Sequence, residues 1–475
     1  MVVETGRRSS LPYGVSRVLV LGAGRSGLAA ARALVGRGYA VTLSDSGPVE
    51  LSADLDVGSD AGASMVTRLG PQGEELLVDV DLVIKSPGIP GDVPIVWTAR
   101  RRGIPVWSEI ELGYRMLRNR ISAVTGTNGK TTTTSLVGHM FAMAGLPVQV
   151  VGNIGTAMTN LVDAIEPEAE VVVEVSSFQL EDIHQFRPVV AILLNLTQDH
   201  LDRHGTMEHY AEIKARVFEN QQTGDVAVLS ADDPLVASVG RKLARRDTAP
   251  EIIWFSTAGL HDTVSRLEGE RLVLMGEPSL RLTELNLKGL HNVENCLAAA
   301  SAVLSQGIDK AAVEEALRTF PGVEHRLQWA GTVRGVQYVN DSKATNVEAA
   351  LKALSAYPRD VHLILGGRDK ASDYAPLAQA CLGTCRSVYL IGEAAPLIRS
   401  AFETLAEQVD REGLPELRDS GDLERAVHEA AAAALEGDTV LLAPACASFD
   451  QYRNFEERGH HFVRLVAELS QAAER

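Results

Sequence analysis

The residues best suited to chemistry stand in one short loop, Gly126-Thr127-Asn128-Gly129-Lys130-Thr131-Thr132. An apolar run over residues 121–124 leads into this loop, and an uncharged helical pattern follows it. Glycines let backbone N–H groups turn toward one anionic centre, and the next helix directs the positive end of its dipole to the same point. Lys130 adds a positive charge, and the Thr131 hydroxyl suits Mg²⁺. The loop predicts a nucleoside triphosphate site, with a plain turn and an exposed lysine as the alternative.

Glu174 is the next candidate, because it belongs to an apolar strand predicted over residues 170–178. A buried carboxylate needs either a basic partner or a metal ion. The loop upstream favours the metal, since carboxylate and hydroxyl oxygens are ligands that Mg²⁺ accepts. We therefore expect Glu174 to face a Mg²⁺ ion beside Thr131.

Three further segments each allow two interpretations. The turn over residues 197–204 holds two acids and two histidines, including His200, and is either a solvated loop or a metal or acyl-group contact. Lys214 lies in an amphipathic helical pattern, which alone predicts an exposed charge. Asn292 and Asn295 open a helix of small residues, where they either cap the helix or contact a purine edge.

A second glycine motif stands near the start of the chain. A strand predicted over residues 17–21 feeds a G-x-G-x-x-G turn at residues 22–27, and the following strand ends in Asp45. This is the dinucleotide-binding fingerprint, in which the acid accepts hydrogen bonds from a ribose. The same geometry seats any nucleotide diphosphate, so a nicotinamide cofactor and another nucleotide are both open. Ser86-Pro87-Gly88 follows a later strand, at the end where such sheets bind ligands, and is otherwise a tight turn.

The last third of the chain holds one more polar motif at the end of a predicted strand, residues 340–346. Thr345 and Glu348 have the spacing of a helix capping box, which is a sufficient structural reason for their types. Capping requires neither Asp341 nor Lys343. These two residues are therefore candidates for chemistry.

The composition of the chain limits the classes of partner and the compartment that are compatible with these motifs. A net charge of −17 argues against a nucleic-acid or anionic-membrane partner. Four cysteines without a C-x-x-C pair predict free thiols in a reducing compartment. Residues 131–162 carry no charged side chain, but Gly145-Leu146-Pro147 divides them into a helix, a turn and a strand, so we expect no membrane span.

The chain is too long, at 475 residues, for a single core. Strand and helix patterns alternate, which predicts an α/β protein of three domains: N-terminal Rossmann-like (17–118), central P-loop ATPase-like with a parallel sheet (119–321) and C-terminal Rossmann-like (322–475). Residues 1–16 lack the apolar core of a signal peptide and are predicted to be a disordered tail. The clefts between domains are the expected working site.

Six motifs in one order carry a resemblance to a known family. They occupy residues 126–131, 152–155, 174–180, 199–202, 340–346 and 445–450. Together they are similar to the motifs of the Mur ligases, and the likeness extends from Val18 to the last helix. It implies a cytoplasmic, ATP-dependent ligase of peptidoglycan synthesis. Residues 366–370 and 448–455 are similar to the branch that adds D-glutamate to UDP-N-acetylmuramoyl-L-alanine, whereas Val323-Glu324 departs from an expected Leu-Pro.

The resemblance also implies roles for single residues. The ATP contacts would be Gly126, Thr127, Asn128, Gly129, Lys130, Thr131, Thr132, Asn292, Asn295, Arg326 and Asp341. The UDP-linked substrate would contact Arg25, Ser26, Asp45, Ser46, Ser86, Gly88 and Asn153, and D-glutamate would contact Thr345, Lys370, Ser448 and Phe455. Two Mg²⁺ ions would bind Thr131, Glu174 and His200, and Lys214 would carry a CO₂-derived carbamate that reaches the metal. The catalytic set would be Lys130, Glu174, His200, Lys214 and Lys343.

Other function classes explain less of the sequence. A nicotinamide-dependent oxidoreductase leaves the phosphate loop and Glu174 without a purpose, and a guanine-nucleotide switch requires an N-K-x-D signature that the sequence lacks. Within the family, the L-alanine-adding and folylpolyglutamate-forming enzymes are the alternatives. We expect a monomer that acts on small molecules, without nucleic-acid or membrane partners.

Overall fold

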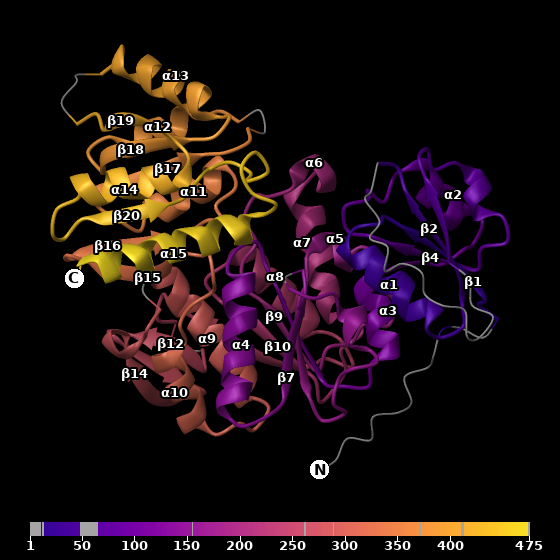
Figure 1. Cartoon of the computed structure of the whole chain (residues 1–475). Helices are drawn as coiled ribbons and strands as arrows, with labels where there is room; N and C mark the ends of the chain where they lie inside the picture. The colour runs from indigo at the N-terminus through magenta and orange to yellow at the C-terminus, as the bar shows by residue number, and fades with distance from the viewer. Residues whose placement is uncertain are drawn as a thin grey trace. The chain divides into compact units, whose positions relative to one another are not determined.

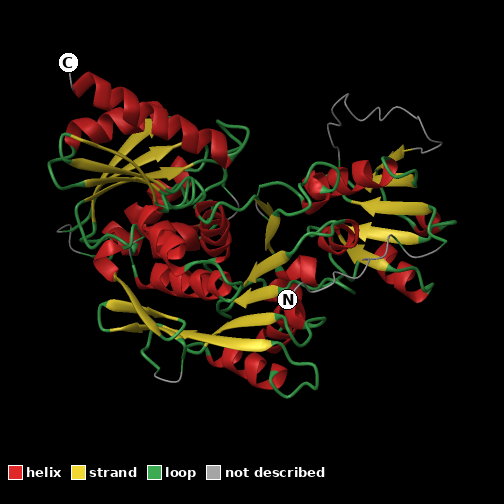
Figure 2. Cartoon of the chain, turned by 90° about the horizontal axis from the view of Figure 1, so that it is seen from below, coloured by secondary structure: helices red, strands yellow, loops and turns green. Residues whose placement is uncertain are grey.

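The computed structural model describes residues 11, 14–47, 65–153, 155–260, 263–287, 289–369, 372–409 and 413–473. These residues form three mainly parallel sheets of five, nine and six strands, with helices packed against them (Figures 1 and 2). The chain divides into two compact units, Met1–Phe320 with the first two sheets and Pro321–Arg475 with the third. The predicted α/β class is confirmed. Of the predicted tail, only residues 11 and 14–16 lie within the described part.

The first sheet has the strand order β3-β2-β1-β4-β5, with every pair parallel. Its strands are β1 (Arg17–Leu21), β2 (Ala40–Asp45), β3 (Met65–Leu69), β4 (Leu82–Lys85) and β5 (Val106–Ser108), and its helices are α1 (Arg25–Val35), η2 (Glu74–Leu77), α2 (Pro94–Arg101) and α3 (Glu109–Met116). Val18 and Val20 pack on the α1 and α3 side, while Leu19 and Leu21 pack on the α2 side. Both faces are buried, as expected for a parallel sheet. The strand order reverses between β1 and β4, where such sheets bind nucleotides.

The central sheet has the order β14-β13-β12-β11-β10-β9-β6-β8-β7, in which only the β12–β14 ladders are antiparallel. Its strands are β6 (Ile121–Thr125), β7 (Val148–Gly152), β8 (Glu170–Glu174), β9 (Val190–Leu193), β10 (Val226–Ser230), β11 (Glu251–Ser256), β12 (Ser265–Glu268), β13 (Arg271–Leu274) and β14 (Glu277–Arg281). Its helices are α4 (Lys130–Met143), η3 (Met158–Leu161), α5 (Ser177–Leu180), α6 (Leu201–His204), α7 (Met207–Ala215), η4 (Arg216–Phe218), α8 (Pro234–Leu243), η5 (Leu282–Glu284), α9 (Leu290–Leu304) and α10 (Lys310–Thr319). Helix α4 packs against α9 and α10 (Figure 1).

The strand predicted over residues 170–178 is too long. Strand β8 ends at Glu174, and Ser176 caps α5 instead. The Ser176 side chain accepts the Gln179 N–H, and the Gln179 side chain accepts the Ser176 N–H, which makes a capping box. The S-x-x-Q spacing in the sequence was the signal for this helix start.

Buried carboxylates on α3 join the first sheet to the central one. Glu111 is fully buried and accepts hydrogen bonds from the backbone N–H groups of His184, Gln185 and Phe186 at 2.9–3.0 Å. Glu109 accepts both the N–H and the hydroxyl of Thr159, at 2.6 and 2.7 Å. These hydrogen bonds connect two sheets that the sequence assigns to separate domains.

The third sheet has the order β15-β16-β20-β17-β18-β19 and is parallel except for β15. Its strands are β15 (Gln328–Val333), β16 (Val336–Asn340), β17 (Val361–Gly366), β18 (Cys385–Ile391), β19 (Glu416–Gly421) and β20 (Thr439–Leu442), and its helices are α11 (Val347–Leu354), α12 (Ala375–Cys381), α13 (Ala395–Ala406), α14 (Leu423–Ala433) and α15 (Phe455–Ala473). Leu363 and Leu365 pack with α11–α13, and Ile364 packs with α14 and α15. The cap of α11 is Asn346, so the predicted Thr345 capping box is wrong by one residue.

The four cysteines are free and buried, as predicted. Among the described residues, no helix combines the length and the apolar character needed to cross a bilayer.

Candidate active site

The phosphate loop joins β6 to α4 in the interior of the nine-stranded sheet. Gly126 and Gly129 have φ values of +146° and +82°, which residues other than glycine rarely adopt. Lys130 Nζ donates to the carbonyls of Gly126 and Thr127 at 3.0 and 2.7 Å. The predicted strand, glycine turn and helix start are therefore all present, and the lysine lies over its own loop.

Helix α9 brings two predicted residues to this loop. Asn295 accepts a hydrogen bond from Thr133 Oγ1 at 3.2 Å and donates to Asn292 Oδ1 at 3.2 Å. A Cβ atom on Gly129 would lie 2.2 Å from Asn295 Oδ1, so only glycine permits this approach. The N-cap of α9 is Gly289, so the capping interpretation of the two asparagines is wrong.

Glu174 ends β8 directly beside β6, where it pairs in register with Val124. Its side chain is buried, and Oε1 accepts a hydrogen bond from Asn153 Nδ2 at 2.8 Å. Oε2 is also buried, and it has no hydrogen-bond partner among the described residues. An unpaired buried carboxylate oxygen is unfavourable by itself and fits a divalent cation held next to the loop.

Lys214 is the clearest departure from the sequence pattern. Its side chain is only 1% exposed, so the predicted exposed charge is wrong. Nζ donates to the Gly126 carbonyl at 2.8 Å, the same oxygen that Lys130 contacts. Burial, together with the charge of Lys130, holds the pKa of Lys214 well below its usual range. Two lysines at one carbonyl therefore favour the neutral, nucleophilic form of the Lys214 amine.

His200 stands just before α6 with a left-handed φ of +52°. Its side chain is half exposed, and Nε2 lies 3.5 Å from Asp199 Oδ2. The Phe178 ring packs on it with 4.9 Å between centroids. His200 is thus accessible at the end of α5, as a metal-binding role requires, but that role stays a prediction.

The first glycine turn is built tightly. A Cβ atom on Gly27 would lie 1.8 Å from the Gly22 carbonyl, which explains the third glycine of the motif. Asp45 Oδ2 accepts the Ala23 N–H at 2.7 Å, so this acid braces the turn itself. Arg25 and Ser26 begin α1 here, Ser46 follows β2, and Ser86 and Gly88 follow β4 at the same edge of the sheet.

The second compact unit gathers its own predicted residues. Asp341 accepts the Leu327 N–H at 3.3 Å, and burial raises the pKa of Asp341 to about 6 although Arg326 and Lys343 oppose the shift. Lys343 Nζ lies 5.4 Å from the centre of the Phe455 ring. Ser448 is buried, and Thr345 lies before α11. Lys370 is outside the described residues.

Two residues near these sites were not predicted. Asn195 Oδ1 accepts the Asn128 N–H at 2.8 Å and so shapes the phosphate loop; its position after a buried strand was the available signal. Arg458 is buried and donates to Ser342 Oγ and to the Cys446 carbonyl at 3.0 and 3.2 Å. It holds two polar loops together, but its neighbours in the sequence are mostly charged or polar residues, and no local pattern predicts its burial.

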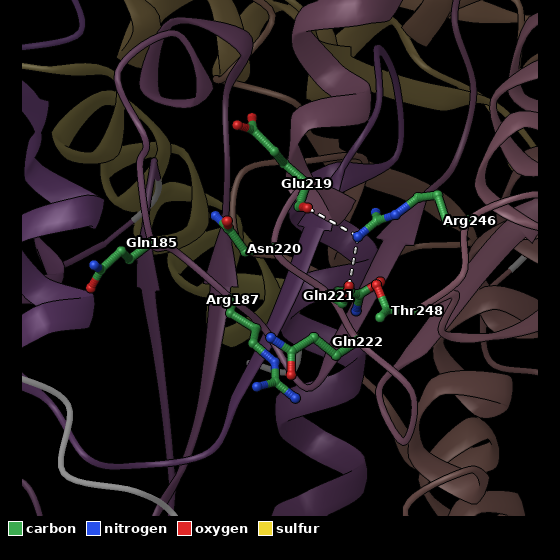
Figure 3. A pocket seen from close by; sticks show the side chains of 8 residues that line it. All are labelled: Gln185, Arg187, Glu219, Asn220, Gln221, Gln222, Arg246 and Thr248. Carbon is green, nitrogen blue, oxygen red and sulfur yellow. Dashed lines mark hydrogen bonds between the residues drawn. The ribbon is translucent and has the colours of Figure 1, made fainter.

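A polar cavity of about 310 Å³ lies near the start of β9, at the strand end opposite the phosphate loop (Figure 3). Arg187 there is paired with Asp225 at 2.7 Å. Arg246 donates to the carbonyls of Phe218 and Gln221, each at 2.8 Å. Because these bonds already engage both arginines, the cavity adds nothing to the candidate site.

Comparison with known proteins places this geometry in a family. Residues 16–108 match the model of the Mur ligase MurD-like N-terminal domain, residues 124–303 the Mur ligase middle domain, and residues 325–446 the Mur ligase glutamate ligase domain. The chain belongs to the Mur ligase family. Members of this family are ATP-dependent amide ligases that use Mg²⁺, and the predicted three-domain architecture is theirs.

Curated relatives extend over nearly the whole chain. The UDP-N-acetylmuramoylalanine–D-glutamate ligase of Solibacter usitatus is 44% identical over 450 residues, covering 95% of this chain and 97% of the relative. The enzyme of the same name from Pelotomaculum thermopropionicum is 44% identical over 462 residues, covering 95% and 98%. Among solved structures, UDP-N-acetylmuramate-alanine ligase from Thermotoga maritima has a TM-score of 0.57 at 22% identity, covering 95% and 99%. MurF from Acinetobacter baumannii has a TM-score of 0.59 at 16% identity, covering 96% and 94%; these two support the fold alone.

Proposed function

We propose that this chain joins D-glutamate to UDP-N-acetylmuramoyl-L-alanine and converts ATP to ADP and phosphate, in peptidoglycan precursor synthesis. The observation that carries the proposal is its 44% identity to ligases named for this reaction, over 95% of its length. The site geometry is consistent with it, because two lysines and a buried carboxylate lie next to a phosphate loop. The L-alanine-adding and folylpolyglutamate-type reactions are the alternatives within the family.

The reaction must make a carboxylate reactive toward an amine. Transfer of the γ-phosphoryl group to the alanyl carboxylate forms a C–O–P linkage and releases ADP. The D-glutamate nitrogen then attacks the carbonyl carbon and loses a proton, and the tetrahedral intermediate expels phosphate as the amide forms. Lys130, the loop N–H groups and Lys343 would stabilise the charge that develops on the phosphoryl oxygens.

The residues that would hold Mg²⁺ are Thr131 and Glu174 for one ion and His200 for a second. Bound there, the ions would supply positive charge to the phosphate oxygens. The first assignment is supported by Glu174 Oε2, which is buried and has no hydrogen-bond partner in the part of the chain that the structure describes.

Lys214 is proposed to carry a carbamate. Its depressed pKa favours the neutral amine, the form that can add to CO₂ with loss of a proton. The product is an anion beside the phosphate loop, which, unlike the amine, can bind Mg²⁺.

The remaining assignments are proposed on the resemblance. Arg25, Ser26, Asp45, Ser46, Ser86, Gly88 and Asn153 would bind the UDP-linked substrate, Asn292, Asn295, Arg326 and Asp341 would bind the nucleoside of ATP, and Thr345, Lys370, Ser448 and Phe455 would bind D-glutamate. We also propose domain bounds of 17–118, 119–321 and 322–475, a monomer, and a cytoplasmic location, where ATP and the nucleotide-linked acceptor are available.

The direct test is release of ADP by the purified chain. ATP, Mg²⁺, UDP-N-acetylmuramoyl-L-alanine and D-glutamate together should give stoichiometric ADP, phosphate and amide, whereas omission of any one should not. Lys130→Ala should abolish release, and Lys310→Ala, a lysine on α10, serves as the control. Faster turnover with L-alanine and UDP-N-acetylmuramate would instead support the L-alanine-adding reaction.

A further inference from the structure

Lys85 is a buried lysine to which the ligation chemistry assigns no role. It is the last residue of β4 and only 1% exposed. Its Nζ contacts three acceptors: the Ile89 carbonyl at 3.0 Å, Glu181 Oε2 at 3.1 Å and Asp182 Oδ2 at 3.1 Å. The first two contacts are hydrogen bonds and the third is an ion pair, so the buried ammonium group is held by two carboxylates and a carbonyl.

One of these contacts fixes the loop after β4. Ile89 N–H donates to the Ser86 carbonyl at 3.0 Å, which closes a turn over residues 86–89. Ser86 N–H donates in turn to the Leu21 carbonyl at 2.9 Å, at the end of β1. Lys85 therefore stabilises the loop over residues 86–89 through the Ile89 carbonyl. Ser86 and Gly88 of this loop are proposed to contact the uridine diphosphate.

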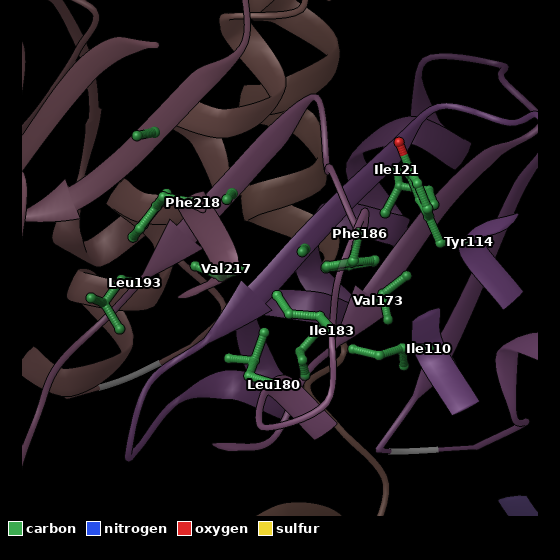
Figure 4. Close-up of a cluster of buried hydrophobic side chains, with 14 of the residues drawn as sticks. Ile110, Tyr114, Ile121, Val173, Leu180, Ile183, Phe186, Leu193, Val217 and Phe218 are labelled. Carbon is green, nitrogen blue, oxygen red and sulfur yellow. The ribbon is translucent and has the colours of Figure 1, made fainter. Parts of the chain in front are cut away.

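A second contact leads into the central sheet. Glu181 directly follows α5, and its neighbours Leu180 and Ile183 are buried in the core (Figure 4). This anchoring sets the direction of the Glu181 side chain. Its other oxygen, Oε1, lies 3.7 Å from the Arg203 guanidinium and 4.0 Å from His204 Nδ1.

Arg203 and His204 belong to α6, which begins immediately after His200. His204 Nε2 is 3.0 Å from Ser177 Oγ, and its ring is stacked on Phe178 at 5.5 Å. Burial lowers the pKa of His204, so this ring is neutral. The Arg203 guanidinium lies 4.5 Å above the same Phe178 ring. Through these contacts α5 and Glu181 determine where α6, and with it His200, stands.

We propose that Lys85 is a positioning residue that couples the loop over residues 86–89 to the His200 turn, so that acceptor binding and metal binding support each other. The inference rests on the proposed function, because both sites belong to that reaction. Without the ammonium group, Asp182 keeps Arg100 at 2.5 Å, but Glu181 loses its close partner. Glu181 also borders a cavity of about 800 Å³, into which its side chain has room to turn. The turn held by Ile89 and the helix held by Glu181 would then shift together.

The test compares Lys85→Met with Lys310→Met in steady-state assays of ADP release. Lys310 likewise contacts a carboxylate and a carbonyl, Glu277 and Pro278, and is distant in sequence from both sites. Loss of a supporting residue of this kind typically costs ~10–100-fold. For Lys85→Met we expect the acceptor KM and the Mg²⁺ concentration for half-maximal rate each to rise ~10-fold or more, with the ATP KM within about 2-fold of wild type. Lys310→Met should change none of them.

A second variant separates positioning from charge balance. Lys85→Met/Glu181→Gln removes both charges of the close pair and leaves Asp182 with Arg100. If Lys85 only neutralises Glu181, the double variant regains the wild-type acceptor KM, and the proposal is wrong. If Lys85 positions the two segments, the raised KM and Mg²⁺ requirement persist although thermal stability recovers. Equal changes in the acceptor and ATP KM values would also contradict it, whereas a wild-type chain that releases no ADP would contradict the proposed reaction itself.

Discussion

Gly129→Ala tests whether the close approach of α9 to the phosphate loop matters for catalysis. The added Cβ would lie 2.2 Å from Asn295 Oδ1 and 3.1 Å from Asn295 Cγ. Since non-bonded heavy atoms normally stay ~3.5 Å apart, Asn295 must retreat by roughly 1 Å. A misplacement of that size in a substrate-positioning residue can reduce the rate ~100-fold. The left-handed φ of +82° at Gly129 adds a backbone penalty of ~1–2 kcal/mol.

Gly145→Ala is the matched control, because it imposes the backbone penalty without the collision. Gly145 follows α4 with a φ of +78°, and a Cβ there would meet no atom within 4 Å. Gly145→Ala should therefore lose ~1–2 kcal/mol in the free energy of unfolding, and Gly129→Ala at least as much. Only Gly129→Ala should lose kcat/KM for ATP, by ~100-fold.

The assay is ADP release at varied ATP concentration, beside denaturant unfolding of each variant. If Gly129→Ala is as active as Gly145→Ala while both are destabilised alike, displacement of Asn295 is harmless. The contact of Asn295 with the loop would then be structural, and the assignment of this residue to the nucleotide site would be wrong.

Three other substitutions test single groups. Lys214→Met should abolish turnover yet raise the midpoint of thermal unfolding at pH 7 in CO₂-free buffer. Because the pKa of Lys214 in the folded chain is below the unfolded value of 10.5, the stability of the wild type rises with pH between these two pKa values, and methionine removes the cost of burying an amine that would otherwise be protonated. An unchanged midpoint would contradict the lowered pKa of Lys214. Glu174→Gln should raise the Mg²⁺ concentration for half-maximal rate ~10-fold or more, and an unaltered Mg²⁺ titration would exclude this ligand. Asp341→Asn should stabilise the chain above pH 6 by up to ~3 kcal/mol. Folding raises the pKa of this carboxyl from 3.8 to about 6, so the free energy of unfolding of the wild type falls as pH increases between those two values. Urea titrations should show the gain of the variant at pH 7 and not at pH 4.

The sequence predicted those features that depend on local backbone chemistry. The phosphate loop, the first glycine turn and the strand–helix alternation follow from glycine, apolar runs and helix starts, which act over a few residues. The prediction for Lys214 from its helix pattern was wrong, because its burial depends on the Gly126 carbonyl, 88 positions away. The resemblance instead implied a carbamylated Lys214 that reaches the metal, and that role stays a prediction.

Other errors and omissions have the same cause. The strand ending at Glu174 was predicted four residues too long, because Val175 continues its apolar run and hydrophobic periodicity does not reveal the capping box at Ser176. Lys85, Glu181 and Arg458 resemble ordinary charged residues until the fold brings their partners near. Buried charged residues that pair over long sequence distances produce no periodic pattern in the sequence, so their burial cannot be predicted from periodicity.

The carboxylates of α3 determine how this chain can be dissected. Glu111 satisfies three main-chain donors that lie beyond residue 180, and Ile110 and Tyr114 fill the core of the second sheet. A fragment that ended at residue 118 would expose the side chains of Glu111, Ile110 and Tyr114 to water. A fragment that began there would lack the two apolar side chains in its core and would leave three backbone N–H groups without their acceptor. Truncation after Phe320 leaves both the hydrogen bonds of Glu111 and the packing of Ile110 and Tyr114 intact. Isotope labelling, fragment screening or expression of a smaller, ATP-binding piece would best begin with residues 1–320 kept whole.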